Sequence, residues 1–342
     1  MSLIDKTRDQ LAKNLPFVWY VTPNSSRLCG LLQKTEALHH FKEQDGFIMA
    51  PFSTTTDEIY VLPEAEADFF EEVMDYVEEM NPKEFTIEND TAKAYFKAIV
   101  SQAVQEIDNG TFAKVVLSRK IVIPIEINAL DVFIRMASTY RNAFCYLFSH
   151  PKLGIWIGAT PEQLIKFKGN AFETVSLAGT QRKADFNEWS AKELQEQQFV
   201  TDYILERLHK DVQSLKVAPT ETVEAGSLVH LKTTISGTVF STKNSLQLVK
   251  NLHPTPAVCG LPTEAALAFI RSKEGYDREF YTGFVGLWKA SLGGNLFVNL
   301  RCMKIAPNNV SIYVGCGITK DSNPEAEFYE TEHKSMTMRN IL

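Results

Sequence analysis

Two ionisable side chains stand where a folded chain would perturb their proton affinity. Lys114 opens the apolar run "VVL" in "FAKVVLSRK", so an inward-facing amine there would have a pKa well below its ordinary value of about 10.4. Glu162 follows the turn sequence "GATP", and a buried carboxyl there would have a raised pKa and could donate a proton. Such a pair is what general base and acid catalysis requires. The plain alternatives are a solvated edge lysine and an ordinary turn acid.

A second group of charged residues lies in the segment 321–336, "DSNPEAEFYETEHKSM". Its first residues suit the N-terminus of a helix, with a polar cap followed by proline. Steps of three and four residues then place Glu327, Glu330 and Lys334 on one face of that helix. A capped and solvated helix is the plain alternative.

A third group is the acidic pair Glu193 and Glu196 in "SAKELQEQQFVTDYILERL". Both project to the same side of the predicted helix, so periodicity leaves the choice between them open. Either carboxylate, facing Glu330 from the closing helix, would make a two-carboxylate site for a hard divalent cation such as Mg²⁺.

Glycines and one arginine could bind an anion. The sequences "SLAGT" and "VGCGIT" predict glycine-bearing turns whose backbone N–H groups approach an anion closely. Arg301 stands inside the β-rich run "FVNLRCM", where burial is costly unless an anion such as a carboxylate binds the guanidinium. His230 and His253 are read as structural histidines first.

Composition bounds the kind of partner. The chain has 342 residues, 44% hydrophobic and 23% charged, with a formal net charge of -7, which argues against nucleic acid or an anionic membrane as the main partner. The 5 cysteines show no paired spacing, so neither a disulfide framework nor a zinc site is predicted. No apolar run is long enough for a signal core or a membrane span. We therefore expect a cytoplasmic protein that binds a small molecule or a protein.

The elements that must position these residues are strands and helices in alternating groups. Short runs separated by turn pairs between residues 144 and 180 predict antiparallel hairpins. Runs of strands, then helices, then strands again predict an α+β fold, with an amino-terminal region over 1–85 and a core over 86–342. The other predicted elements are an acidic helix at 64–80, helices at 91–110 and about 187–215, and strands at 113–124, 294–307 and 308–319.

Many separated motifs resemble the chorismate-utilising enzymes, in the order found there: "AKVVLSRK", "GATPEQL", "LAGT", "VHL", "LHPTPAVCGLP", "DREFYTGFVG", "LRC", "YVGCGI" and "PEAEFYETEHK". The match covers about residues 90–342, and within this family the chain is most similar to the isochorismate synthases. The resemblance implies two large antiparallel β-sheets packed as a sandwich with helices on the outside. It also implies chorismate as substrate and Mg²⁺ as cofactor.

The resemblance also implies a role for each matched position. Lys114 would be the base and Glu162 the acid. Glu196, rather than Glu193, and Glu330 would bind the metal directly. Glu327 would contact these ligands or reach the metal through a water molecule. The residues implied to bind substrate are Ala178, Gly179, Thr180, His230, Tyr281, Arg301, Gly315, Gly317 and Lys334.

A few positions separate the members of this family. Lys114 stands where the ammonia-using enzymes carry glutamine, which points to water as nucleophile and to no amidotransferase subunit. Ala178 stands where aminodeoxychorismate synthases carry a nucleophilic lysine, and Ala257 where salicylate synthases tend to carry threonine. The implied activity is therefore isochorismate synthase, with a salicylate synthase or an inactive chorismate-binding protein as alternatives. Thr282 departs from the glycine of many relatives. Supply to menaquinone or to a catechol siderophore stays open.

Overall fold

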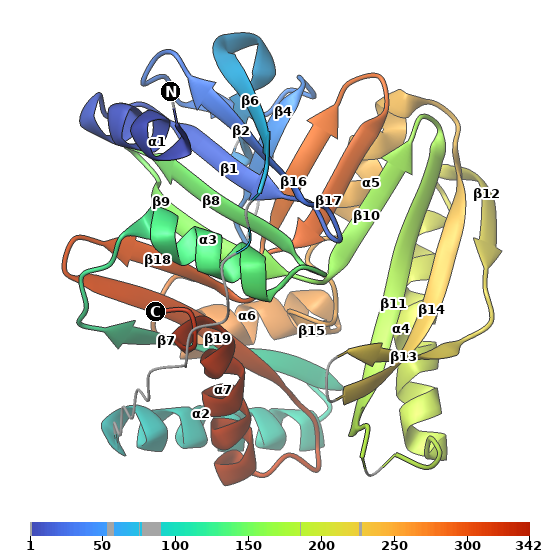
Figure 1. Ribbon diagram of the computed structural model, residues 1–342. Coiled ribbons are helices and arrows are strands. Elements are labelled where there is room, and N and C mark those ends of the chain that lie inside the picture. Colours follow the sequence, from blue (N-terminus) through green and yellow to red (C-terminus); the bar gives the residue numbers. More distant parts are fainter. Residues whose placement is uncertain (1, 53–57, 75, 77–89, 185, 226–227) are drawn as a thin grey trace.

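Two antiparallel β-sheets pack against each other, and helices cover their outer faces (Figure 1). The computed structural model describes residues 2–52, 58–74, 76, 90–184, 186–225 and 228–342. This architecture confirms the predicted α+β sandwich. The predicted boundary between 85 and 86 falls outside the described residues, although strands before it belong to both sheets.

The first sheet contains nine of the described strands. Their spatial order is β15 (Gly260–Leu261), β7 (Lys114–Ile123), β19 (Asn309–Ile318), β18 (Cys302–Ala306), β9 (Gly154–Thr160), β8 (Phe144–His150), β1 (Phe17–Val21), β2 (Arg27–Gln33) and β6 (Ala67–Val73).

The second sheet contains ten of the described strands. Their order is β12 (Val212–Val217), β14 (Leu228–Val239), β11 (Ala171–Arg182), β10 (Gln163–Lys168), β17 (Gly293–Val298), β16 (Phe284–Lys289), β4 (Gly46–Ala50), β5 (Tyr60–Pro63) and β3 (His39–His40), with β13 (Glu221–Ala225) paired to β14.

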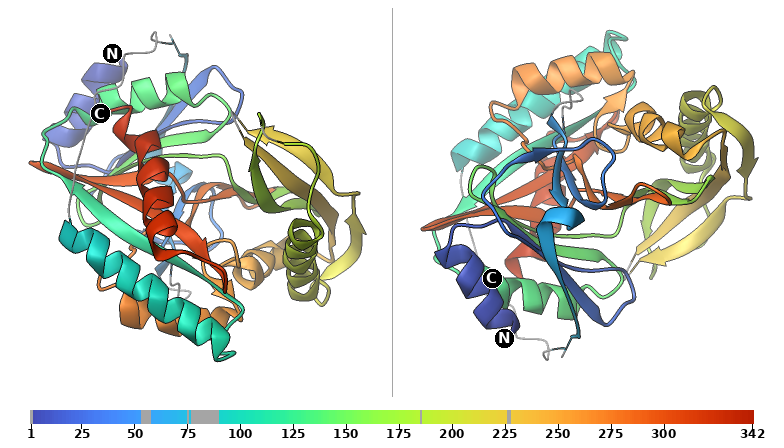
Figure 2. Two further views of the ribbon diagram at one scale, coloured as in Figure 1. Left: turned by 90° about the horizontal axis from the view of Figure 1, so that it is seen from below. Right: turned by 90° about the horizontal axis from the view of Figure 1, so that it is seen from above.

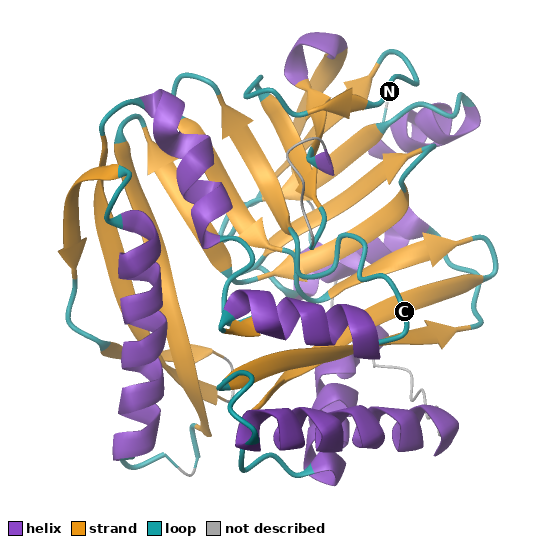
Figure 3. Cartoon of the chain, turned by 180° about the vertical axis from the view of Figure 1, so that it is seen from behind, coloured by secondary structure: helices purple, strands orange, loops and turns teal. Residues whose placement is uncertain are grey.

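Helices lie on the outside of this sandwich, as Figure 2 shows from two directions. The structure describes α1 (Leu3–Ala12), α2 (Asp90–Asp108), α3 (Ala129–Thr139), α4 (Ala191–Leu208), α5 (Ser245–Leu252), α6 (Thr263–Lys273) and α7 (Pro324–Arg339), with short 3₁₀ turns at Glu64–Glu66 and Thr242–Asn244. Figure 3 shows α4 running along the strands of the second sheet. None of the described helices is long and apolar enough to cross a lipid bilayer.

An aromatic core fills the space between the sheets. Strand β8 alternates, so that Phe144, Tyr146 and Phe148 point to the second sheet while Cys145 and Leu147 point to the helices outside. Stacking of the Phe144 ring on Phe297 of β17, with centroids 4.8 Å apart, joins the two sheets directly. Burial of both faces explains why β8 reads as a continuous apolar run.

Two neighbouring segments cross from one sheet to the other. The chain leaves β9 through residues 161–162 and enters β10, and it leaves β17 through 299–301 and enters β18. Each crossing is bonded to a strand that flanks the other, because Val298 N of β17 donates to Glu162 O at 2.9 Å and Ala159 N of β9 donates to Arg301 O at 3.0 Å. Both crossings therefore lie side by side, at the point in the first sheet where β9 ends and β18 begins.

Because β18 begins only at Cys302, one edge of β19 has no neighbouring strand, among those described, beyond that point. Pairing of β18 with β19 stops at Cys302, opposite Tyr313, whereas pairing of β19 with β7 continues to Ile318. Beyond Tyr313, β19 pairs with β7 alone among the described strands. Residues 314–318 thus present a strand edge that is unpaired among the described strands, and the region beside this edge is called the opening below.

Three local predictions need correction. Residues 64–73 form a 3₁₀ turn and strand β6, not a helix, because β6 pairs with β2 and its Glu71 carboxylate binds Arg27 across that pair. The long helix ends at Leu208, and residues 212–217 form β12. The glycines of "SLAGT" and "VGCGIT" lie within strands β11 and β19 rather than in turns.

A buried ion pair fastens α6 and the loop after it to β7. The Arg278 and Glu274 side chains are only 2% and 1% exposed, with Nη2 and Oε1 2.5 Å apart. Arg278 Nη2 also donates to Val116 O at 2.7 Å and Nη1 donates to Val258 O at 2.9 Å. Glu274 accepts from Ser118 N at 2.6 Å and from Ser118 Oγ at 2.9 Å. This network satisfies both buried charges and reaches the strand that begins at Lys114.

Replacing Glu274 with glutamine should therefore destabilise the protein by about 3–5 kcal/mol, because the Arg278 charge stays buried without its counterion. The measurement is the free energy of unfolding in urea. Asp9→Asn is the matched control, since its exposed pair with Lys13 is worth less than about 1 kcal/mol. Equal losses in the two variants would contradict a special role for the buried pair.

Candidate active site

The opening beside β19 is lined by glycine backbone. Gly315 and Gly317 alternate with Cys316, which points to the core beneath α2 and α7. A Cβ at Gly317 would lie 3.1 Å from Lys114 Cε and 3.6 Å from Lys114 Nζ. The distance to Cε is shorter than an ordinary contact between two carbon atoms. Glycine at this position therefore leaves the space that the lysine amine occupies.

Lys114, the first residue of β7, directs its amine into this opening. Burial lowers the pKa of Lys114 below its ordinary value, the Glu196 carboxylate opposes that shift, and the Lys334 ammonium adds to it. The Lys114 side chain keeps some solvent access. Protein atoms therefore surround the amine on most sides, and one side stays open. The predicted lowering of the Lys114 pKa is confirmed.

Glu162 lies in the crossing between β9 and β10. Burial raises the pKa of its carboxyl, whereas the cations Lys114, Arg301 and Lys334 lower it by a smaller amount. Because the influence of a charge weakens with distance, these three cations are near enough to Glu162 to affect its pKa. The predicted raised pKa of Glu162 is also confirmed.

The closing helix α7 presents the predicted face to the same opening. Asn323 caps it by accepting from the N–H groups of residues 325 and 326. Lys334 Nζ donates to Glu330 Oε1 at 2.7 Å and to Gly315 O at 3.1 Å, which ties the helix to β19. Glu330 also acts electrostatically on Lys114.

Helix α4 supplies one acidic residue to the site and uses the other as a cap. Glu193 forms a capping box with Ser190, in which the N-cap N–H donates to the Glu193 carboxylate at 2.9 Å. Gln181 Nε2 donates to the same carboxylate. Glu196 lies one turn later and raises the Lys114 pKa. The structure thus separates two residues that periodicity left equivalent.

A bulge in β11 carries the sequence "LAGT". Pairing of β11 with β14 shifts between Ala178 and Gln181, and Gly179 adopts a positive φ of 65°, which favours glycine. His230 Nδ1 donates to Gly179 O at 3.0 Å and so holds the bulge. The side chain of Thr180, also a predicted site residue, lies outside the described part of the structure.

Tyr281 and Arg301 approach the opening from the loops between elements. The ring of Tyr281 is buried and stacks on Tyr313 with centroids 5.6 Å apart, and a Cβ at Gly315 would lie 3.0 Å from its hydroxyl. Arg301 is exposed and has a left-handed backbone, φ 47°. It belongs to the crossing after β17 rather than to a strand interior, which corrects the predicted setting.

Sequence reasoning missed the residues that support this site. Arg278 and Glu274 were not singled out, because the partners that reveal their role lie far away along the chain. Thr282, noted only as a departure, is fully buried with φ 61°, an uncommon conformation for a β-branched residue. Arg278 Nη1 donates to its hydroxyl at 3.2 Å. His253, in contrast, is a structural residue, since its Nε2 donates to Phe52 O at 3.0 Å.

The donor set at this opening fits a hard cation. Glu196, Glu327 and Glu330 offer only carboxylate oxygens, the ligands that Mg²⁺ prefers. Burial raises the pKa of the Glu327 carboxyl overall, although Ser322 and Cys316 lie close enough to lower it. The buried Oε2 has no hydrogen-bond partner of good geometry among the described residues, so a cation or water could satisfy it. Within the described ranges, however, no three acidic, histidine or cysteine side chains already converge as a ligand group.

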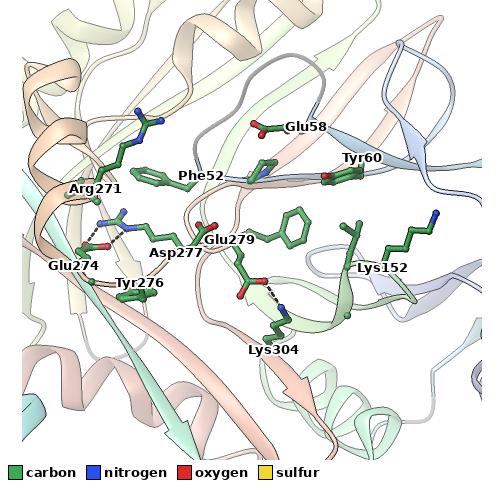
Figure 4. A pocket seen from close by; sticks show the side chains of 17 residues that line it. Phe52, Glu58, Tyr60, Lys152, Arg271, Glu274, Tyr276, Asp277, Glu279 and Lys304 are labelled. Carbon is green, nitrogen blue, oxygen red and sulfur yellow. Dashed lines mark hydrogen bonds and ion pairs between the residues drawn. The ribbon is translucent and has the colours of Figure 1, made fainter.

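A cavity of about 860 Å³ lies elsewhere, between the loop 274–280 and the ends of β4, β5 and β18 (Figure 4). Its wall includes the Glu274–Arg278 pair and the Lys304–Glu279 pair. None of the predicted catalytic, substrate or metal residues lines it. Size alone therefore does not mark the site, and the perturbed pair Lys114 and Glu162 is the better guide.

The charges around Lys114 predict how its pKa responds to substitution. Glu196→Gln should lower the Lys114 pKa further, and Lys334→Gln should raise it, because these are the opposing charges that act on the amine. Titration of ¹³C-labelled lysine Cε by NMR measures both shifts. Glu221→Gln, in an exposed pair with Lys232, is the control that should leave Lys114 unchanged. Shifts of the opposite sign would show that the amine lies outside this cluster.

Comparisons with known proteins identify the family of this chain. Residues 48–342 match the family described as chorismate binding enzyme. The chain is 32% identical over 261 residues to the isochorismate synthase EntC of Escherichia coli K12, covering 72% of this chain and 66% of that protein. It is 31% identical over 258 residues to the vibriobactin-specific isochorismate synthase of Vibrio cholerae, covering 71% and 65%. The chain thus spans less than two thirds of the length of these relatives.

Solved structures show the same fold. The menaquinone-specific isochorismate synthase of Escherichia coli superposes with a TM-score of 0.80 at 21% identity, over 96% of this chain and 88% of that one. Anthranilate synthase component I of Streptococcus pneumoniae superposes with a TM-score of 0.72 at 17% identity, over 95% and 92%. Taken with the family match over residues 48–342, these findings show that the chain belongs to the chorismate-binding enzymes.

Proposed function

We propose that this protein is an isochorismate synthase, which converts chorismate reversibly to isochorismate with Mg²⁺ as cofactor. The observation that carries the proposal is the pair Lys114 and Glu162, whose pKa values burial shifts in opposite directions within one opening. This makes an amine that can accept a proton and a carboxyl that can donate one. The relatives at 31 and 32% identity that are named isochorismate synthases support the same activity.

The reaction needs one proton removed and one supplied. Neutral Lys114 takes a proton from water as the water oxygen bonds to C2 of the ring. The two ring double bonds shift, the C4–O bond breaks with its electron pair on oxygen, and Glu162 protonates the departing hydroxyl. One water molecule is consumed and one is released, so the ring changes only in the position of its hydroxyl and double bonds. A lysine base favours water over ammonia, so no amidotransferase subunit is expected.

The substrate carries two carboxylates, and the opening offers donors for them. Arg301 and Lys334 supply positive charge near Glu162, and Tyr281 can donate its hydroxyl because burial raises its pKa well above the ordinary value. Free backbone N–H groups at the exposed edge of β19, around Gly315 and Gly317, suit the same role.

Glu196 and Glu330 would bind Mg²⁺ directly, and Glu327 would contact these ligands or reach the ion through a water molecule. When bound, the ion supplies positive charge that neutralises a substrate carboxylate and fixes its orientation. Lys334, which now donates to Glu330, keeps that carboxylate in place at the end of the helix turn. We expect the enzyme to work in the cytoplasm and its product to serve menaquinone or a catechol siderophore.

The direct test is incubation with chorismate and Mg²⁺ followed by product analysis. The expected product is isochorismate, without pyruvate and without dependence on ammonia, and a chelator should abolish its formation. Pyruvate release would indicate a salicylate synthase instead. Lys114→Ala should still bind chorismate but lose about 10²- to 10⁴-fold in turnover, since one proton transfer is lost. Lys120→Ala, an exposed lysine on the same strand, is the matched control, and undiminished turnover by Lys114→Ala would end this assignment.

The same pair predicts a bell-shaped pH dependence of kcat/KM. Activity should rise as Lys114 loses its proton, at a pH below the ordinary lysine value because burial lowers its pKa. Activity should fall as Glu162 loses its proton, at a pH above the ordinary carboxyl value because burial raises its pKa. The two limbs report the coupled pair. A flat profile between pH 5 and 10 would contradict both assignments.

A further inference from the structure

A cavity of about 280 Å³ lies in the second sheet where β10 and β11 separate. These strands pair only between Lys166–Lys168 and Ala171–Glu173. β11 pairs with β14 along its whole length, and beyond Glu173 it no longer pairs with β10. The space left between β10 and β11 is closed by α4 and by the segment after α5. The cavity therefore follows from the topology of the sheet.

Glu162 lines this cavity at one end. Arg301, Tyr281, Gly315 and Gly317, assigned above to the substrate carboxylates, do not. The remaining walls are mainly apolar, from Leu164, Val175, Leu177, Val200, Ile204, Leu252 and Val298. Such walls would not attract a dianion.

The polar groups in the wall suit a small neutral molecule. Lys232 is a cation there, but its ammonium lies 3.3 Å from the Glu221 carboxylate, and Glu173 adds a negative charge. Thr255 Oγ1 is buried and makes no hydrogen bond with any described residue. A buried hydroxyl without a partner is satisfied in most proteins by ordered water, and the volume has room for several water molecules.

We propose that this cavity receives the water molecule released at C4 and supplies the solvent that restores the Glu162 proton; this rests on the proposed function. After each turnover Glu162 is a carboxylate and Lys114 an ammonium. The released water must leave, and one proton must pass from Lys114 to solvent while another reaches Glu162. The cavity provides the solvent path on the Glu162 side, with Thr255 as its buried hydrogen-bonding group.

The test compares Thr255→Val, which keeps the shape of the side chain but removes the hydroxyl, with Thr255→Ser, which keeps the hydroxyl. A second change, Val175→Phe, fills the cavity, and Val217→Phe on an exposed position of β12 is its matched control. We expect Thr255→Val and Val175→Phe to lower kcat about fivefold, the equivalent of one hydrogen bond, with KM for chorismate unchanged. Thr255→Ser should restore most of the turnover, and Val217→Phe should leave it intact.

Other outcomes would overturn the proposal. A rise in KM at constant kcat would mean that the cavity seats part of chorismate, and unchanged kinetics would mean that it has no role in turnover. A wild-type protein that forms no isochorismate would refute the proposed function itself, before any variant is compared. If the variants do not fold, a high-resolution crystal structure of the wild-type protein decides the matter: ordered water on Thr255 Oγ1 supports the proposal, and a dry cavity overturns it.

Discussion

The buried pair of Arg278 and Glu274 fixes strand β7, the loop after α6 and the segment before β15 relative to one another. Its hydrogen bonds run to Val116 and Ser118 of β7 and to Val258 just before β15. Strand β7 begins at Lys114, and the loop after Arg278 carries Tyr281, so the proposed base and one proposed substrate donor are held by the same buried pair. A buried charge pair of this kind adds little net stability but is costly to break. Its contribution is therefore to position, more than to stabilise.

The proposed catalytic pair works against folding. Lys114 and Glu162 both lose hydration in the folded protein, and neighbouring charges compensate only in part. The aromatic core between the sheets and the cores under the helices supply the stability that this arrangement needs. Thr282 and Arg301, both with left-handed backbones, add local strain close to the same site, as is common where function sets the geometry.

Local patterns predicted the parts of the fold that depend on local interactions. A polar cap before Pro324, the start of β7 and the two hairpins β8–β9 and β10–β11 follow from nearby residues, and the structure selects Asn323 among the three possible caps. Strand β6 could not be predicted in this way. It pairs with β2, a strand that lies far earlier in the chain, and this pairing overrides the helical preference of glutamate and alanine. The site residues came mostly from the family resemblance. One local signal went unread: "SAKE" is a capping box, which assigns Glu193 to the helix end.

The paired crossings have a consequence for motion. Glu162 O accepts from Val298 N of β17, and Arg301 O accepts from Ala159 N of β9, so each crossing is bonded to a strand that flanks the other, and Glu162 and Arg301 are coupled in position. Lys114 and the glycines of β19 stay with the first sheet alone. A change in the spacing of the two sheets would therefore change the distance between Lys114 and Glu162, so the relative position of the proposed base and acid depends on how the sheets pack.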